Sequence, residues 1–301
     1  MALGDRFRRQ VTRLADTLLT MRFLLLFPLA VFFSSSQSSP ANAPIPVRVH
    51  SETVAAFDSY VRLTEERNEA ELKRGSALLW IDSLAPAQRT EAYAALKRGE
   101  AQIQQLSTLE NGKPIVFPGG MIHHWVGVVF IPGAKLGDVL AVLEDYDHQS
   151  TYYSPDVERS KIESRDGDHF RVFLRFRRHK VITVVLNTEH DVQYFHDAPG
   201  HAHSRSSAVR IVEVENPGKN DEREKQPGDD GGFLWRMETW WRMEERDGGV
   251  YVQSEVASLT RDIPTGLGWL VSPFVTSIPK ETLVFTLDAT RKAVEASLRQ
   301  P

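Results

Sequence analysis

The sequence predicts an α+β protein in which a curved antiparallel sheet wraps around one long C-terminal helix. Residues 251–259 alternate between the two faces of a strand and run through a short polar corner into a long, broadly apolar stretch. Further alternating segments precede them, and two pairs of these segments are joined by Asp-Gly turns. The region before residue 110 shows helical spacing instead. A sheet that grips a helix often leaves a cavity between the two layers, so the predicted fold also bears on function.

The beginning of the chain has the features of an export signal. Arginines precede an apolar run at residues 23–33, and a Ser-rich stretch then leads to Ala41-Asn-Ala43, a small-x-small cleavage pattern. The apolar run is much shorter than the ~20 residues that span a bilayer. We therefore expect residues 1–43 to be cleaved and the protein to be periplasmic or secreted, with Met1 or Met21 as the start.

Composition narrows the classes of function. The chain has 301 residues, a net charge of −4 and no cysteine, so export brings neither disulfides nor an acylated cysteine anchor. Basic residues form no stripe interleaved with aromatics, which argues against a nucleic-acid partner. The common nucleophile, zinc-protease, P-loop and dinucleotide motifs do not occur, so no cofactor and no catalytic residue is predicted.

No metal site is predicted either. Histidines gather near the hairpin tip expected at residues 198–200, where they are more often polar filler than ligands: His190, His196, His201 and His203. Acidic residues in 216–232 do not match the spacing of a calcium loop. That segment has no apolar residue, so we expect a mobile, solvated loop.

Residues 44–118 should form a helical extension docked on the main domain, 119–301. A first helix begins at Ser51, with apolar residues at Val54, Phe57 and Val61. A second helix is expected from residue 85 to residue 109, with Pro86 at its start and Asn111-Gly112 at its end.

The main domain should begin with a strand at 122–131, followed by a short helix from 136 and a helical turn that Ser154-Pro155 ends. Six strands are expected next, at residues 157–164, 170–178, 181–195, 204–214, 233–244 and 250–260. The long helix follows.

Alternation assigns side chains to opposite faces of two strands. One face, expected to meet the long helix, carries Trp235, Met237, Trp241 and Met243 in one strand and Phe170, Val172, Leu174 and Phe176 in the other. The opposite face carries Glu238, Trp240 and Arg242, and Phe173, Arg175 and Arg177. Those charges could form a solvated outer surface, or one or two of them could enter the cavity and anchor a polar head group.

Three segments resemble a known family. Residues 122–131 followed by Pro132-Gly133, Asp145-Tyr146 with the link 152–157, and the stretch 264–290 are similar to the START-like superfamily, also called SRPBCC or polyketide cyclase/lipid-transport. The resemblance covers about residues 121–298 and implies the helix-grip fold. Members bind sterols, phospholipids, quinones, hormones or polyketides, and some are enzymes. The extension and the 216–232 loop depart from the pattern.

The resemblance implies binding, and transport, of a hydrophobic small molecule (lipid, quinone or polyketide-like) in an internal cavity, with transient membrane contact. The candidate ligand-binding residues are His124, Tyr146, Tyr153, Phe173, Arg175, Glu238, Trp240, Phe274 and Phe285. One alternative is an enzyme of cyclase/aromatase or hydrolase type, with proton transfer by His124, Tyr153 or Glu238. A second is a protein-interaction or chaperone module built on the extension.

Overall fold

The computed structural model describes residues 48–75, 78–179, 182–226, 228–262 and 268–299, with the side chains of 268–276 left out of the description. The predicted export signal and the side chain of Phe274 therefore lie outside the described residues. Residues 44–301 cluster as one compact unit, and its described residues are considered below.

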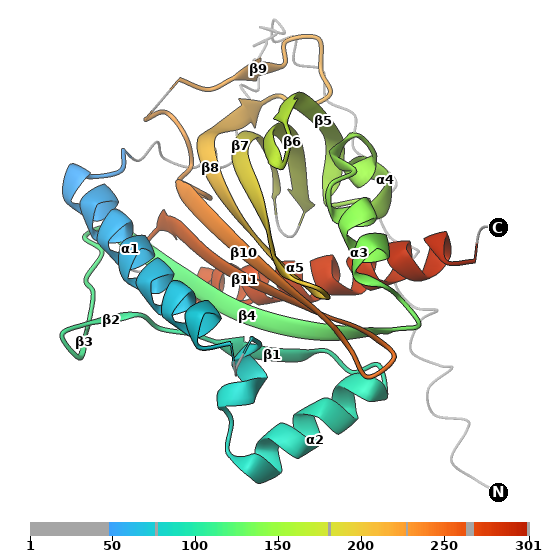
Figure 1. Ribbon diagram of the computed structural model, residues 1–301. Helices are drawn as coiled ribbons and strands as arrows, with labels where there is room; N and C mark the ends of the chain where they lie inside the picture. The colour runs from blue at the N-terminus through green and yellow to red at the C-terminus, as the bar shows by residue number, and fades with distance from the viewer. Residues whose placement is uncertain (1–47, 76–77, 180–181, 227, 263–267, 300–301) are drawn as a thin grey trace, which may run out of the picture. The chain divides into compact units, whose positions relative to one another are not determined.

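A curved antiparallel sheet of nine strands forms the centre of the protein (Figure 1). Its order is β1-β4-β11-β10-β8-β7-β6-β5, with β9 paired to β8 outside this path. The strands are β1 Gln102–Gln105, β4 Gly120–Pro132, β5 Val157–Asp166, β6 His169–His179, β7 Thr183–Ala198, β8 His201–Glu215, β9 Arg223–Glu224, β10 Arg236–Arg246 and β11 Gly249–Arg261.

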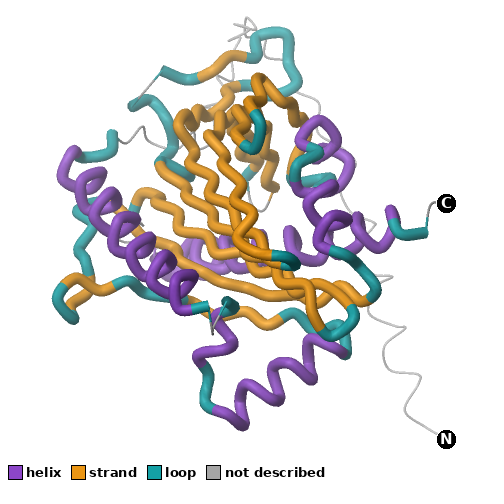
Figure 2. Tube along the Cα trace, viewed as in Figure 1, coloured by secondary structure: helices purple, strands orange, loops and turns teal. Residues whose placement is uncertain are grey.

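Helices cover both faces of the sheet (Figures 1 and 2). Helix α5, Gly268–Ser297, lies along the inner, concave face, and α3 Leu136–Leu143, η2 Tyr146–His148 and α4 Gln149–Tyr152 lie between β4 and β5 in the chain. The outer face carries α1 Ser51–Arg74, η1 Trp80–Ser83 and α2 Pro86–Lys97. The predicted α+β fold, with a sheet wrapped around a C-terminal helix and an N-terminal extension, is confirmed.

The β10–β11 hairpin follows the predicted turn chemistry, whereas Asn111-Gly112, predicted to end a helix, forms a hairpin turn instead. The turn between β10 and β11 places Asp247 at φ 57° and Gly248 at φ 76°. Asn111 and Gly112 have φ values of 51° and 76° and join β2 Leu109–Glu110 to β3 Lys113–Pro114. Two consecutive positive φ values match the right-handed twist of the flanking strands, which explains the Asp-Gly and Asn-Gly pairs.

The second predicted helix is wrong over its C-terminal half. Helix α2 ends at Lys97, and Gly99 follows with φ 88°, a conformation that glycine adopts at low cost. The chain then forms β1, which pairs with β4 and places Ile103 against the interior. The extension therefore adds an edge strand to the sheet as well as helices.

The 216–232 segment is attached to the sheet through charge. Arg175 of β6, itself buried, donates two hydrogen bonds to the Glu222 carboxylate, each of 2.9 Å. These bonds and the Gly218 N–H lower the pKa of Glu222 to about 2. Strand β9 adds backbone pairing with β8. The expectation of a wholly solvated loop is thus wrong: a segment without apolar residues is held by a buried cation instead.

Three apolar clusters hold the layers together. The largest lies between the inner face and α5 and includes Val252 and Leu287. The second joins Phe57 of α1 to Leu259, and the third joins α2 to Tyr251. Strand β11 is therefore buried on both faces, because alternate residues contact α5 and the extension.

Candidate functional site

Large apolar side chains on the inner face remain only partly buried. The register places them on strands opposite α5 or on α5 itself, packed against the largest apolar cluster: Trp125, Phe176, Trp241, Val256 and Phe285. We call these five residues the inner apolar patch. Apolar surface that stays accessible beside a buried core favours an apolar ligand.

Two serines flank this patch. Trp241 of β10 lies directly opposite Ser204 of β8 on one side and Ser254 of β11 on the other. Ser204 is 2% exposed and Ser254 is 1% exposed, and neither hydroxyl has a hydrogen-bond partner in the described part of the chain. The indole Nε1 of Trp125 is likewise buried and unpaired there. Buried polar atoms without partners are uncommon, because each costs about 1–3 kcal/mol.

The two buried histidines of the inner face are uncharged near neutral pH. Burial lowers the pKa of His190 and of His123 to about 4 in each case. His190 Nε2 lies 2.8 Å from Thr188 Oγ1, which donates to the Leu174 carbonyl and must therefore accept from the imidazole. Nδ1 of His190 is then an acceptor, 3.4 Å from Ser206 Oγ.

Tyr146 and Tyr153, both predicted as ligand contacts, lie on the interior side of the sheet. The Tyr146 hydroxyl is 2.9 Å from the Tyr194 hydroxyl, and the Tyr153 hydroxyl is 2.9 Å from Thr290 Oγ1 of α5. Burial raises the pKa of Tyr153 to about 12 and raises that of Tyr146 further. These bonds connect the short helices to the sheet and to α5, and Phe285 lies on the same side.

The other predicted residues face outward. His124 and Trp240 contact the α1 cluster, and Glu238 lies beside it. Arg175 pairs with Glu158 and Glu222, and Phe173 lies opposite Lys161 and Glu189 on that same face. Strand alternation points the charges of this face away from α5: Glu238 lies beside the extension, and Arg175 contacts the 216–232 segment. These five outward-facing residues are therefore not expected to contact a ligand bound between the sheet and α5.

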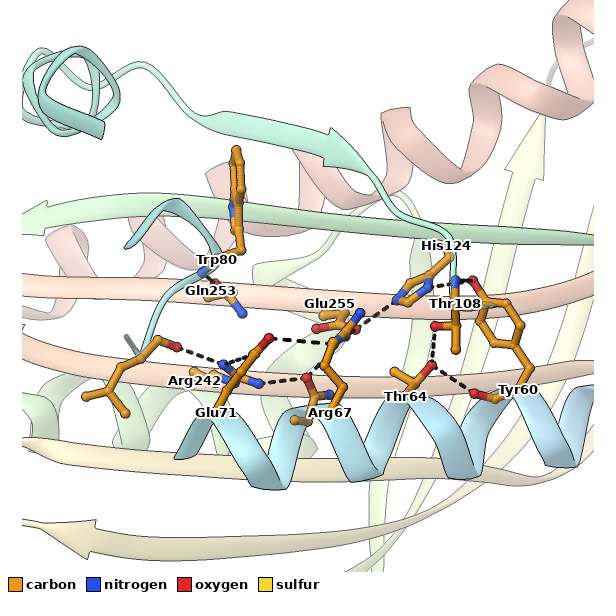
Figure 3. A network of polar contacts seen from close by, with 12 residues as sticks. Tyr60, Thr64, Arg67, Glu71, Trp80, Thr108, His124, Arg242, Gln253 and Glu255 are labelled. Carbon is orange, nitrogen blue, oxygen red and sulfur yellow. Dashed lines mark hydrogen bonds and ion pairs between the residues drawn. The ribbon is translucent and has the colours of Figure 1, made fainter. Parts of the chain in front are cut away.

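A buried network of polar contacts crosses the outer face between α1 and the sheet (Figure 3). The Tyr60 hydroxyl accepts from the Thr108 N–H at 2.9 Å and donates to His124 Nδ1 at 2.8 Å. His124 Nε2 in turn donates to Glu255 Oε1 at 2.8 Å, and Arg67 of α1 pairs with the same carboxylate. Burial alone would raise the pKa of Glu255, but the bond from His124 and the charge of Arg67 hold it below its ordinary value.

Arg242 of β10 extends this outer-face network (Figure 3). It donates to Asn68 Oδ1 at 2.6 Å and to the Leu78 carbonyl at 3.0 Å, and it lies 2.8 Å from a Glu71 carboxylate oxygen. Arg67, Asn68 and Glu71 lie along α1, and the sequence pattern predicted no role for them. Their partners lie more than 150 residues away in the chain, so local periodicity carried no signal of them.

The proposed acid–base groups do not meet at one place. His124 and Glu238 lie on the outer face, whereas Tyr153 lies on the inner side of the sheet. Among the described residues, no group of three or more His, Asp or Glu side chains could hold a metal ion. No helix in that part of the chain is long and apolar enough to cross a membrane.

Comparison with known proteins finds similarity at the level of structure. No protein-family model matches the sequence, and no curated protein matches it. The chain is similar to the solved Zhui aromatase/cyclase of a Streptomyces species, with 14% identity, a TM-score of 0.40, and coverage of 60% of this chain and 98% of that one. It is also similar to a STAR-related lipid transfer protein from Xanthomonas axonopodis, with 20% identity, a TM-score of 0.40, and coverage of 66% and 99%.

A START superfamily protein from Mycobacterium smegmatis shows 13% identity and a TM-score of 0.38, with coverage of 58% of this chain and 98% of that one. The strand order, the two short helices after β4 and the grip of the sheet on α5 are the arrangement predicted from the sequence. This arrangement is that of a helix-grip fold.

Replacing Glu255 with Ala tests the outer-face network. The side chain of Glu255 is 3% exposed, and its loss leaves His124 and Arg67 without their shared partner. We expect a loss of about 3–5 kcal/mol in the free energy of unfolding, measured by urea denaturation. The control is Glu66→Ala, which removes an exposed α1 pair with Arg62 and should cost about 0–1 kcal/mol. Equal losses in the two variants would contradict a buried tie.

Glu238 should make stability depend on pH. Burial raises its pKa from 4.5 to about 7, although Ser207 and Arg205 oppose this shift. The folded protein therefore binds the proton more tightly than the unfolded chain, and this contribution is present below pH 4.5 and lost as the pH rises to 7.

We expect Glu238→Gln to remove about 1–3 kcal/mol of the decrease in unfolding free energy between pH 5 and pH 8. Denaturation at the two pH values measures it, with Glu66→Gln on the exposed side of α1 as control. Parallel pH dependences for Glu238→Gln and the unmodified protein would contradict the shifted carboxyl.

Proposed function

We propose that the protein binds a hydrophobic small molecule between the inner face of the sheet and α5, and that it carries this molecule. The inner apolar patch is the observation that supports the proposal most directly. Its aromatic and aliphatic side chains are turned toward α5, yet they remain partly accessible beside a core whose other members are buried.

An apolar ligand would gain affinity from this arrangement without any cofactor. Covering apolar surface contributes about 25 cal/mol per Å². A ligand seated on Trp125, Trp241 and Phe285 would cover aromatic surface on the sheet and on α5 at once. A carrier has to release its ligand as well, and transient contact with a membrane is part of this proposal where the ligand is a lipid.

The proposed site is on the inner face of the sheet, opposite the outer face that carries His124, Glu238 and Trp240. Tyr146, Tyr153 and Phe285 remain candidates because they lie between the layers. Phe274 also remains a candidate by its position in α5.

We also propose that the protein acts outside the cytoplasm, as the pattern of residues 1–43 predicts. We expect the mature protein, isolated from its host, to begin near residues 42–46 when its N-terminus is sequenced. Intact Met1 or Met21 on protein from the cytosolic fraction would contradict export.

Phe285→Ala tests binding between the layers. Because Phe285 is only partly buried, its truncation should cost the free protein less than the about 3–5 kcal/mol of a fully buried Phe. Affinity for the fluorescent probe 1-anilinonaphthalene-8-sulfonate should fall by about fivefold to tenfold, since the probe loses aromatic surface.

Leu287→Ala is the matched control on the same helix. Leu287 is fully buried, so this change should cost about 2–5 kcal/mol in unfolding free energy and leave probe affinity nearly unchanged. Denaturation and probe titration are measured on both variants. A full-sized loss of stability for Phe285→Ala with unchanged probe affinity would show a packed interior and overturn the proposal.

A further inference from the structure

On the inner face, polar side chains lie beside Trp241 at positions where the fold does not require them. Across the described sheet, one row of directly opposite residues runs Tyr194, Ser204, Trp241, Ser254, Gly127. The next row carries Ser206 and Thr239 beside Val256 and Trp125. Hydroxyl groups thus lie beside the inner apolar patch on both sides of the Trp241 ring.

The Ser204 and Ser254 hydroxyls, which we call the serine pair, form no hydrogen bond that would stabilise the described part of the protein. Each is almost wholly buried and unpaired, although a serine in a strand can bond a nearby backbone group. An alanine would fit at either position without that cost. A bound ligand that hydrogen-bonds one of these hydroxyls would explain why the buried positions carry serine.

The surroundings of the serine pair are uncharged. Tyr194, Trp241, Thr239 and Ser206 are neutral, and His190 behind them carries no charge near neutral pH. The cation described beside the inner apolar patch is Lys280, exposed on α5, with its Nζ 5.8 Å from the ring centroid of Trp125. A carboxylate or phosphate placed beside the serine pair would be desolvated without a buried cation to compensate it.

Charges elsewhere on the inner face are already paired. Arg178 bonds Asp156 and Thr282, and Glu213 bonds Lys225. Neither pair presents a free charge to the serine pair. Arg165 of β5 lies over the Phe170 ring and is paired with Glu144. Arg242 and Arg175 point outward, to the extension and to the 216–232 segment respectively.

We propose that the ligand is an amphipathic molecule with an uncharged hydroxyl or carbonyl group, which hydrogen-bonds one of the two hydroxyls of the serine pair beside Trp241 while its apolar frame covers the inner apolar patch. This inference rests on the proposed function and specifies the class of its ligand. Both Ser hydroxyls can donate as well as accept, so alcohols and ketones satisfy the same site.

Three probes with one carbon frame test the proposal: hexadecane, hexadecan-1-ol and hexadecanoate, each displacing 1-anilinonaphthalene-8-sulfonate from the full chain. We expect the alcohol to displace the dye at about three- to tenfold lower concentration than the alkane, the range of one neutral hydrogen bond. The acid, ionised at pH 8, should be weaker than the alcohol.

The double variant Ser204→Ala/Ser254→Ala should abolish the preference for the alcohol over the alkane and leave alkane displacement unchanged. Its melting temperature should be unchanged or higher, because an unpaired buried hydroxyl is removed from each strand. Ser164→Ala, an exposed serine on edge strand β5, is the control and should keep the preference.

The outcomes separate the two proposals. Displacement by none of the three probes would overturn the proposed function itself. Equal displacement by alkane and alcohol, a preference for the acid, or a preference that survives in the double variant would overturn the ligand class while leaving hydrophobic binding standing. Equal displacement by alkane and alcohol is also the result expected if a water molecule satisfies the serine pair.

Discussion

The buried carboxylate of Glu255 is the contact on which the arrangement of this protein depends. It lies on β11, an interior strand of the sheet, and is paired with His124 of β4 and Arg67 of α1. A charge in this position is tolerable only when it is paired and hydrogen-bonded, so α1 must sit where Arg67 can reach it. The apolar clusters around Phe57 and around Tyr251 stabilise the contact between the extension and the sheet, but hydrophobic packing does not fix its geometry. The ion pair with Arg67 therefore ties the position of α1 to β11 of the sheet.

Covering the outer face in this way divides the sheet by chemistry. The extension supplies partners for the charges of the outer face, including Arg242, which reaches Asn68 and Glu71. The part of the inner face around Trp241 carries aromatic, aliphatic and hydroxyl side chains, and the charges elsewhere on this face, such as Arg178 and Glu213, are paired. A helix-grip domain without such an extension would expose the outer face to water. Here the sheet is the middle layer of three, and β11 is buried along most of its length for that reason.

Most of the fold could be predicted from local patterns. The two-residue alternation and the Asp-Gly turns located β5, β6, β7, β8, β10 and β11, and the apolar stretch after residue 264 located α5. Two differences between the predictions and the structure have one physical cause. The segment 102–105 is short and mostly polar, so its sequence is compatible with a continuing helix. It forms a strand because it pairs with β4. His124 and Glu238 were assigned to a cavity because alternation separates two faces but does not say what covers each. The partners that decide both cases are distant in the sequence.

The division of the sheet also separates the response to pH from the binding of a ligand. Glu238, whose pKa of about 7 makes it the group most sensitive to neutral pH on β10, lies on the outer face with Arg205 and Glu65. On the inner face, His123 and His190 have pKa values of about 4 and remain neutral through the same range. A change from pH 6 to pH 8 therefore alters the junction between the extension and the sheet, while the polarity of the inner face stays constant. An uncharged ligand beside Ser204 and Ser254 would be bound by groups that do not titrate between pH 6 and pH 8. Its affinity should therefore depend on pH only if a change at the junction with the extension shifts the strands.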